Sequence, residues 1–218
     1  MKDRIRSFLV FTSFGYRLAT FAILPLLGIW IGHMYCKKYM MPGYLITAFL
    51  LVPIEIMIDH FIFGGICVKD VSHLEYLKCS KRGEWVTRNA LTGGMIRILL
   101  TMLIVFIGNH ISMEVLYPDA GYGFNVVLVP LTLMLFSFAV IMLGATIGRF
   151  FETTSVYYLI SLGAMILETA CMLLLEKNIY LGVFTSLVLA GITGYFSLKI
   201  AMRHIKESYY DKTVKDGV

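Results

Sequence analysis

The chain has 218 residues, of which 58% are hydrophobic and only 15% are charged, and its formal net charge is +5. Soluble domains average about 25% charged residues, so the composition argues against a soluble globular fold and favours a lipid environment. The basic excess follows the sidedness of the predicted spans, so it does not indicate a nucleic-acid partner.

Six apolar runs are each long enough to cross the hydrocarbon core of a membrane, which takes about 20 helical residues. The period-two alternation that marks a transmembrane strand is absent from these runs, so we expect helices. The sequence therefore predicts an all-α integral membrane protein with a single transmembrane domain over residues 1–218. The six predicted spans are 18–35, 43–63, 91–110, 125–147, 154–175 and 179–201.

The lysines and arginines are distributed unevenly about these spans. In a six-span arrangement, 16 of the 19 lie on the side of the chain ends, and only Lys37, Lys38 and Lys177 lie on the other. Because basic residues stay on the cytoplasmic side, we expect both termini to face the cytosol and the chain to lie in the cell membrane. The predicted divisions are an N-terminal interfacial segment (1–17), two spans (18–63), a cytoplasmic loop (64–90), four spans (91–201) and a cytoplasmic tail (202–218).

The N-terminal segment has apolar side chains at helical spacing, at Ile5, Phe8 and Leu9, with basic residues between them. This pattern is typical of a helix that lies in the membrane interface, with its basic residues among the lipid headgroups. The alternative is that residues 1–17 are the first turns of a long first span.

A polar stretch interrupts the apolar sequence at residues 72–85, which read SHLEYLKCSKRGEW. Ser72 and Glu75 have the spacing of a capping box, in which each side chain bonds the backbone amide of the other residue, so we expect a helix from His73. We expect Gly83 to end this helix, and a short polar segment then to connect it to the third span. Two helical turns are not stable alone, so the stretch must rest on lipid or on a partner protein.

The stretch GGICVKDVSHLEYLKCSKRGEWVTRNAL (64–91), between the second and third of six spans, resembles the insert of permease subunits of ABC exporters in the ABC-two superfamily. Those permeases also have an N-terminal interfacial helix and a hairpin of spans five and six. In them the insert is a coupling helix that docks on a separate ATPase subunit. The docking residues that this resemblance implies are Ser72, His73, Leu74, Glu75, Tyr76, Leu77 and Lys78.

The same resemblance implies partners and a cargo. A second copy of the chain or a related permease would complete a dimer around a central path, and ATP and Mg²⁺ would bind to the ATPase subunit. Small bacterial permeases of this shape are often linked to the export of hydrophobic or amphipathic peptides, such as phenol-soluble modulins. One departure from the family is the loop at 176–178, which leaves almost no room for an outer loop between spans five and six.

The sequence gives no sign of catalysis by this chain. No G-x-x-x-x-G-K-[ST] phosphate-binding loop occurs, so we do not expect it to bind ATP by that route. The four cysteines and five histidines lack metal-ligand spacing, so no metal or cofactor is expected on this chain. We therefore expect a non-enzymatic subunit, with a membrane enzyme or a sensor component as a further alternative.

Three carboxylates fall within predicted spans, at Glu55, Asp59 and Glu168. Ionisable groups at such positions face a bundle interior or water and mark candidate ion pathways. Asp59 lies near the cytoplasmic mouth, where interfacial water is expected to solvate it, whereas Glu55 and Glu168 need a partner such as Arg17, Arg97 or a tyrosine. The alternative function is an ion-coupled secondary transporter that uses Glu55, Asp59 or Glu168.

Two predicted spans carry glycine pairs four residues apart, Gly28 with Gly32 and Gly144 with Gly148. Small residues at this spacing share a helix face and let a neighbouring backbone approach closely. We expect these glycines to be helix-packing contacts.

Overall fold

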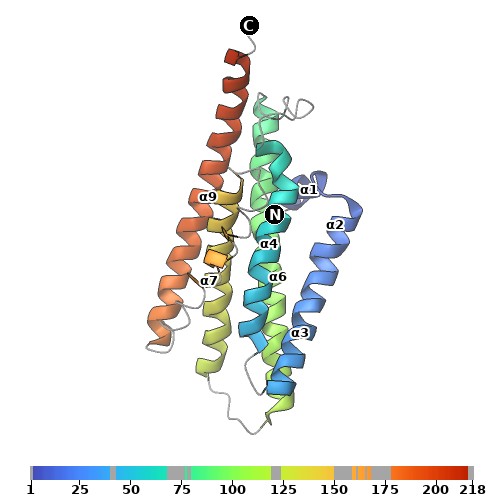
Figure 1. Cartoon of the computed structure of the whole chain (residues 1–218), viewed down its shortest axis with the longest axis vertical. Helices are drawn as coiled ribbons and strands as arrows, with labels where there is room; N and C mark the ends of the chain where they lie inside the picture. The colour runs from blue at the N-terminus through green and yellow to red at the C-terminus, as the bar shows by residue number, and fades with distance from the viewer. Residues whose placement is uncertain are drawn as a thin grey trace.

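The computed structural model describes residues 2–39, 43–67, 77, 80–118, 124–149, 159, 160, 162–164, 166, 167 and 178–215. In this part of the chain nearly every residue is helical and none forms a strand, which confirms the all-α class. Figure 1 shows the long helices side by side in an elongated bundle. The elements are α1 (Lys2–Val10), α2 (Phe14–Leu18), the π-helical segment η1 (Ala19–Ile23), α3 (Leu24–Tyr39), α4 (Gly43–Cys67), α6 (Lys81–Leu116), α7 (Phe124–Gly148) and α9 (Ile179–Lys215).

The described helices suit a membrane protein. Large apolar side chains are exposed along them, as at Trp30 and Phe184, where a lipid solvent would cover them. The predicted span at 154–175 lies mostly outside the described residues, so the total of six spans stays a prediction. Among the described residues, five helices are long and apolar enough to cross a membrane, at Phe14–Lys38, Ile46–Gly64, Lys81–Leu116, Leu128–Gly148 and Ile179–Glu207.

The first of these spans begins at Phe14, earlier than the predicted start at residue 18. Ser13 caps the helix, because its side-chain oxygen accepts a hydrogen bond from the backbone N–H of Tyr16. Elements α2, η1 and α3 then follow without a break. The wide η1 turn comes just before Pro25, which has no N–H to donate to the carbonyl of the preceding turn, so this turn accommodates the proline.

Helix α6 begins at Lys81, well before the predicted start of the third span at residue 91. Ser80 is its N-cap, and the Ser80 Oγ accepts from the backbone N–H of Gly83 over 2.9 Å. Gly83 thus lies in the first turn of a helix, and the prediction that it ends one is wrong, because the serine cap starts α6 at that point. The 36 residues of α6 extend over about 54 Å, which exceeds the roughly 30 Å of a hydrocarbon core.

Helix α4 contacts each of the other spanning helices that the structure describes, namely α3, α6, α7 and α9. Near its C-terminal end, Ile62, Phe63 and Ile66 belong to a small apolar cluster with Phe8 of α1 and Met202 of α9. Its other buried apolar side chains belong to a larger cluster that runs through the middle of the bundle. In lipid such a cluster stabilises the bundle through close packing, because lipid tails are as apolar as the side chains. Members of the cluster include Leu51, Val52 and Ile56 of α4, Ile98 and Met102 of α6, and Leu133 and Ile141 of α7.

The predicted packing glycines lie where helices approach closely. A Cβ atom on Gly32 would lie 2.0 Å from Asn109 Oδ1 of α6, and one on Gly28 would lie 3.1 Å from a valine methyl of α6. A Cβ atom on Gly144 of α7 would lie 2.4 Å from Ile56 Cδ1 of α4. The predicted close approach is therefore confirmed at these three glycines.

Helix α1 lies across the bundle near one end, and the chain turns between α1 and α2 (Figure 1). Phe8 of α1 is buried, and its ring centroid lies 6.2 Å from that of Phe63 in α4. A Cβ atom on Gly93 of α6 would lie 2.3 Å from the Arg4 carbonyl oxygen, so this glycine admits α1. Residues 1–17 thus contain a separate helix that packs on the bundle, while its place in a membrane interface stays a prediction.

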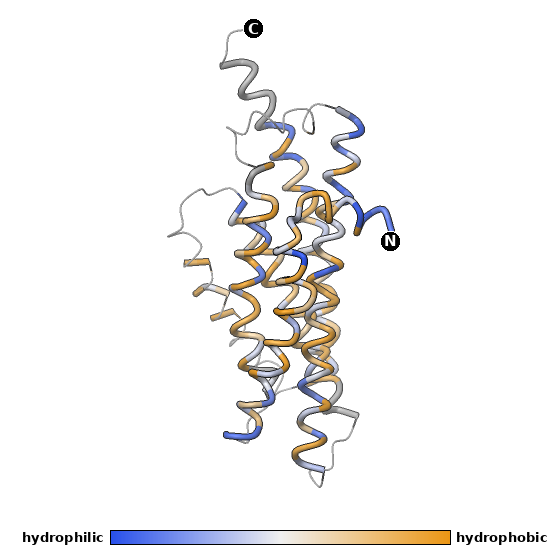
Figure 2. Tube along the Cα trace, turned by 90° about the vertical axis from the view of Figure 1, so that its right-hand side faces the viewer, coloured by the Kyte–Doolittle hydropathy of each residue, from blue (hydrophilic) through white to orange (hydrophobic). Residues whose placement is uncertain are grey.

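Hydrophilic residues gather toward the two ends of the bundle, and apolar residues predominate between them (Figure 2). One end holds α1, the first turns of α6 and the last turns of α9, and it is at the top of Figure 1. We call it the basic end. The other end, which holds the end of α3 and the start of α4, is called the far end.

Candidate functional site

Three buried polar residues form a stripe along α4. Thr47, Glu55 and Asp59 are separated by multiples of four residues, which places them on one helix face. The stripe faces the bundle interior, because Thr47 and Glu55 are 0% exposed and Asp59 is 4% exposed. A charge within a span is costly unless it is paired or hydrated, so the two carboxylates are the first candidates for a functional site.

Glu55 is paired with Arg97 of α6, one of the partners that the sequence suggested. Arg97 Nη1 donates to Glu55 Oε1 over 2.8 Å, and Arg97 Nη2 donates to Glu55 Oε2. The Arg97 side chain is 3% exposed, so the pair lies within the protein and does not extend to the surface. Within the described part of the chain, Arg97 Nε has no hydrogen-bond partner.

Asp59 is paired with Arg149, the residue that follows α7. Arg149 Nε donates to Asp59 Oδ2 over 2.9 Å, and Arg149 Nη2 donates to Asp59 Oδ1 over 2.7 Å. Asp59 is thus almost wholly buried, and the expectation that interfacial water solvates it is wrong, because a guanidinium takes the place of that water.

Arg149 also connects two further groups of the bundle. Its Nη1 donates to Ser197 Oγ of α9 over 3.3 Å, and its guanidinium carbon lies 5.7 Å from the centroid of the Phe63 ring. The planar guanidinium can make these contacts together because it presents five donors in a fixed plane and can stack on a ring. One side chain therefore ties the end of α7 to both α4 and α9.

A third polar contact lies nearer the far end. Asn109 Nδ2 of α6 donates to Thr47 Oγ1 over 2.9 Å, and the Thr47 hydroxyl donates to the Gly43 carbonyl over 2.6 Å. Gly32 of α3 adjoins the same amide, since any side chain there would collide with it. Helices α3, α4 and α6 therefore meet at one hydrogen-bonded crossing, a type of contact that holds helices together in lipid.

The chemistry of this stripe is that of pairing. Each carboxylate has an arginine as counter-charge, and removing either member of a buried pair leaves an uncompensated charge, which is strongly destabilising. The two pairs are one helical turn apart on α4 and draw on α6, α7 and α9, so they fix the register of four helices. No cluster of metal-ligating side chains occurs among the described residues.

The predicted docking residues are placed only in part. Ser72, His73, Leu74, Glu75, Tyr76 and Lys78 lie outside the described residues, as does Glu168. Leu77 is described and is buried. A Cβ atom on Gly83 would lie 2.5 Å from the Leu77 carbonyl oxygen, so the backbone at Leu77 rests directly on the first turn of α6.

Sequence reasoning missed Arg149, Ser197, Thr47 and Asn109 as members of the buried polar set. Arg149 follows the fourth predicted span directly, so in the charge pattern it counts only as one of the 16 basic residues on the side of the chain ends. The spacing of Glu55 and Asp59 was an available signal, because two carboxylates on one helix face call for two cationic partners. Few arginines lie close enough to the spans to be those partners.

Three predicted functional residues are thus described: Glu55 and Asp59 in the buried stripe, and Leu77 in its contact with α6. No family model, characterised protein or solved structure significantly matches the chain. Its function is therefore inferred from its own residues, contacts and charge pattern.

Proposed function

We propose that the chain is the permease subunit of an ATP-driven exporter, and that a separate ATPase chain docks on residues 72–85. Support comes from the five membrane-suited helices, from the placement of 16 of 19 basic residues on one predicted side, and from the insert-like sequence at 64–91. The basic end is then the cytoplasmic end, and α1 is an interfacial helix. ATP and Mg²⁺ are bound by the partner ATPase.

The observation that carries this proposal is the contact between Leu77 and Gly83. It seats Leu77, the described one of the predicted docking residues 72–78, on the first turn of α6, with no space for a side chain between the two backbones. Helix α6 then continues from Lys81 to Leu116 without interruption. A displacement of the docking segment would therefore move a helix that extends across the whole bundle.

Helix α6 has firm connections to its neighbours, so its movement would be passed on. Arg97 ties it to α4 through the buried pair with Glu55. Near the far end, Asn109 of α6 donates a buried hydrogen bond to Thr47 of α4 over 2.9 Å. These contacts support a mechanism in which the docking segment, α6 and their neighbours shift together as a packed unit when the ATPase changes conformation.

The proposed cargo is hydrophobic or amphipathic, such as a peptide. Charged groups in the described interior of the bundle are already paired with each other, which leaves them little capacity to line a path for a polar molecule. We therefore place the path between two permease chains, either two copies of this one or one copy and a related subunit.

The second candidate function is an ion-coupled transporter that uses Glu55, Asp59 or Glu168. The burial of Glu55 and Asp59 within the bundle favours this function, because proton-coupled carriers commonly use buried carboxylates as proton-binding groups. Their two-point pairing with arginine weighs against it. Protonation of either carboxylate would leave a buried guanidinium without a counter-charge, which carries a large energetic cost.

The proposal is tested by purifying the tagged full chain in mild detergent and measuring whether a stoichiometric ATP-hydrolysing subunit stays bound. Leu74→Asp should release that subunit while the permease remains monodisperse. Val115→Asp is the matched control, because Val115 is exposed near the end of α6 at the far end, and this variant should retain the ATPase. Equal retention in both variants would contradict docking on residues 72–85.

The two candidate functions are separated by proteoliposomes that contain only this chain. An exporter subunit should move no cargo without its ATPase, whatever proton gradient is applied. Proton-driven movement of cargo by the isolated chain would establish the carrier instead.

A further inference from the structure

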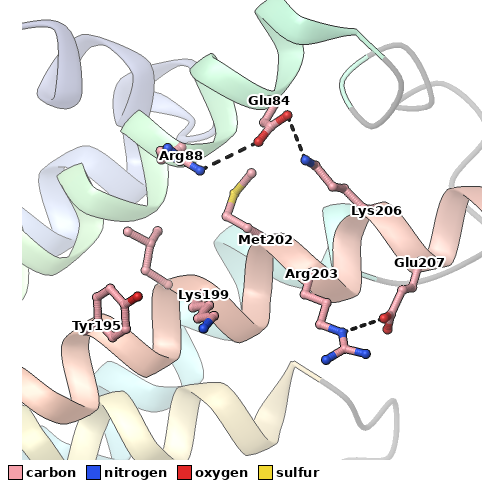
Figure 3. A pocket seen from close by; sticks show the side chains of 9 residues that line it. Glu84, Arg88, Tyr195, Lys199, Met202, Arg203, Lys206 and Glu207 are labelled. Atoms are coloured by element: carbon pink, nitrogen blue, oxygen red, sulfur yellow. Dashed lines mark hydrogen bonds and ion pairs between the residues drawn. The ribbon is translucent and has the colours of Figure 1, made fainter.

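A cleft of about 700 Å³ lies between the first turns of α6 and the last part of α9 at the basic end. Figure 3 shows its lining side chains, which come from these two helices alone. The cleft is separate from the buried stripe of α4, and neither ion pair of that stripe lines it. The lining residues are Glu84, Arg88, Tyr195, Leu198, Lys199, Met202, Arg203, Lys206 and Glu207.

The cleft carries an excess of positive charge, with four cationic and two acidic side chains. Glu84 is shared between Arg88 at 3.7 Å and Lys206 at 3.0 Å, and Glu207 contacts Arg203 Nε over 2.6 Å. These pairs are solvent-exposed, and exposed pairs contribute little, so an incoming anion can readily displace them. Phosphate oxygens would form stronger, charge-assisted hydrogen bonds with the same cations.

Lys199 is the cation best placed to receive an anion. Its Nζ lies 6.0 Å from the centroid of the Tyr195 ring, one turn earlier on α9, and within the described part of the chain it has no ion pair. No carboxylate among the described residues therefore offsets its charge at the point where the cleft passes from charged to apolar lining.

The lining changes in character along α9. Tyr195, Leu198 and Met202 line the apolar part of the cleft, whereas Arg203 and Lys206 follow toward the C-terminus. Met202 is buried in the small apolar cluster that also holds Phe63, and Leu198 packs against this cluster. This order, apolar toward the membrane and cationic toward water, matches the two parts of a phospholipid, and basic sites between spanning helices are known to bind anionic headgroups.

We propose that this cleft binds the phosphate headgroup of an anionic phospholipid from the leaflet at the basic end. The headgroup contacts Arg88, Lys199 and Arg203, and the start of its acyl chain lies along Tyr195 and Leu198. A lipid in this position bridges α6 and α9, two helices that meet directly in few other places. The proposal does not depend on the exporter function, since it rests on the cleft and its charges.

The test uses thermal unfolding of the full chain in detergent with added phosphatidylglycerol or phosphatidylcholine of identical acyl chains. Phosphatidylglycerol should raise the unfolding temperature in a saturable way, because a ligand that binds only the folded state stabilises it by mass action. In Lys199→Gln/Arg203→Gln the concentration for half-maximal effect should rise about thirtyfold, since each basic residue at an anionic lipid surface contributes about fivefold in affinity.

The matched control is Lys2→Gln/Arg6→Gln, which removes the same charge from exposed positions on α1 at the same end. This variant should respond to phosphatidylglycerol as the unmodified chain does. An equal effect of phosphatidylcholine, an unchanged response of the Lys199/Arg203 variant, or an equal loss in the α1 control would overturn the proposal. So would an equal effect of soluble glycerol phosphate, which would indicate a site for soluble anions.

Discussion

Arg97 of α6 and Glu55 of α4, 42 residues apart in sequence, form a two-point ion pair in the middle of the bundle, with both side chains almost completely buried. Next to it on α4, Asp59 forms a second such pair with Arg149. The helices would have to separate before either charge of a pair could be hydrated. We therefore expect the two ion pairs to hold the helices of the bundle in one register.

Glu55→Gln should therefore destabilise the bundle strongly, by about 3–5 kcal/mol, since it leaves the Arg97 charge buried and unpaired. The double variant Glu55→Leu/Arg97→Met should recover most of that loss, because it removes both charges and keeps apolar volume. Denaturant titrations of Glu55→Leu, Arg97→Met and the double variant in detergent measure the coupling. Additive losses in the double variant would show that the two residues do not act as a pair.

Arg149→Lys should lower stability on the order of 2 kcal/mol although the charge is kept. A lysine cannot contact both Asp59 oxygens and Ser197 together, and hydrogen bonds to charged groups contribute about 1.5–3 kcal/mol each. Arg88→Lys is the control, because Arg88 is exposed and its contact with Glu84 is long, at 3.7 Å. The unfolding temperatures of both variants are compared. Equal decreases in unfolding temperature would argue against a special role for the contacts of the Arg149 guanidinium.

Gly32→Ala should destabilise the bundle by about 1–3 kcal/mol, because the new methyl group would collide with the Asn109 amide and overpacking strains a close-packed interior. Gly191→Ala on α9 is the control, since a Cβ atom there would meet nothing within 4 Å. In an unfolding titration the control should match the unmodified chain or exceed it slightly. If Gly32→Ala behaves in the same way, α3 and α6 do not approach each other as described.

Gly83→Ala should uncouple ATP hydrolysis from transport without unfolding the membrane domain. Its Cβ atom would lie 2.5 Å from the Leu77 carbonyl oxygen, so the end of the docking segment would be displaced from α6. Cargo-stimulated ATP hydrolysis by the purified complex should fall, while thermal stability changes little. Gly15→Ala, with open space around the new methyl group, should keep full stimulation, and full stimulation in Gly83→Ala as well would refute the mechanical link.

The helical class and the positions of most spans could be predicted from the sequence, because long apolar runs have few alternatives in lipid. Helix starts were predicted less well. Ser80 and Gly83 are only three residues apart, and the sequence alone did not decide whether the serine starts a helix or the glycine ends one. The structure shows the serine cap, so polar residues assigned to a connecting segment belong to the first turns of α6.

The buried polar set was predictable only where both partners lie within spans. Glu55 and Arg97 were both visible as ionisable residues in apolar runs, and their pairing was one of the expected solutions. The partner of Asp59 was not predictable in this way, because Arg149 follows a span and lies 90 residues away in sequence. Its role depends on how α4, α7 and α9 pack together, which local patterns do not encode.

The central claim is that residues 72–85 lie in the cytosol against an ATPase, and photocrosslinking from position 74 in intact cells tests it most directly. A crosslinking amino acid at position 74 should join the 24.7 kDa chain to an ATP-binding subunit, and an impermeant reagent added outside the cells should not label a cysteine placed there. Crosslinks to lipid alone while export proceeds, or labelling from outside, would contradict the account.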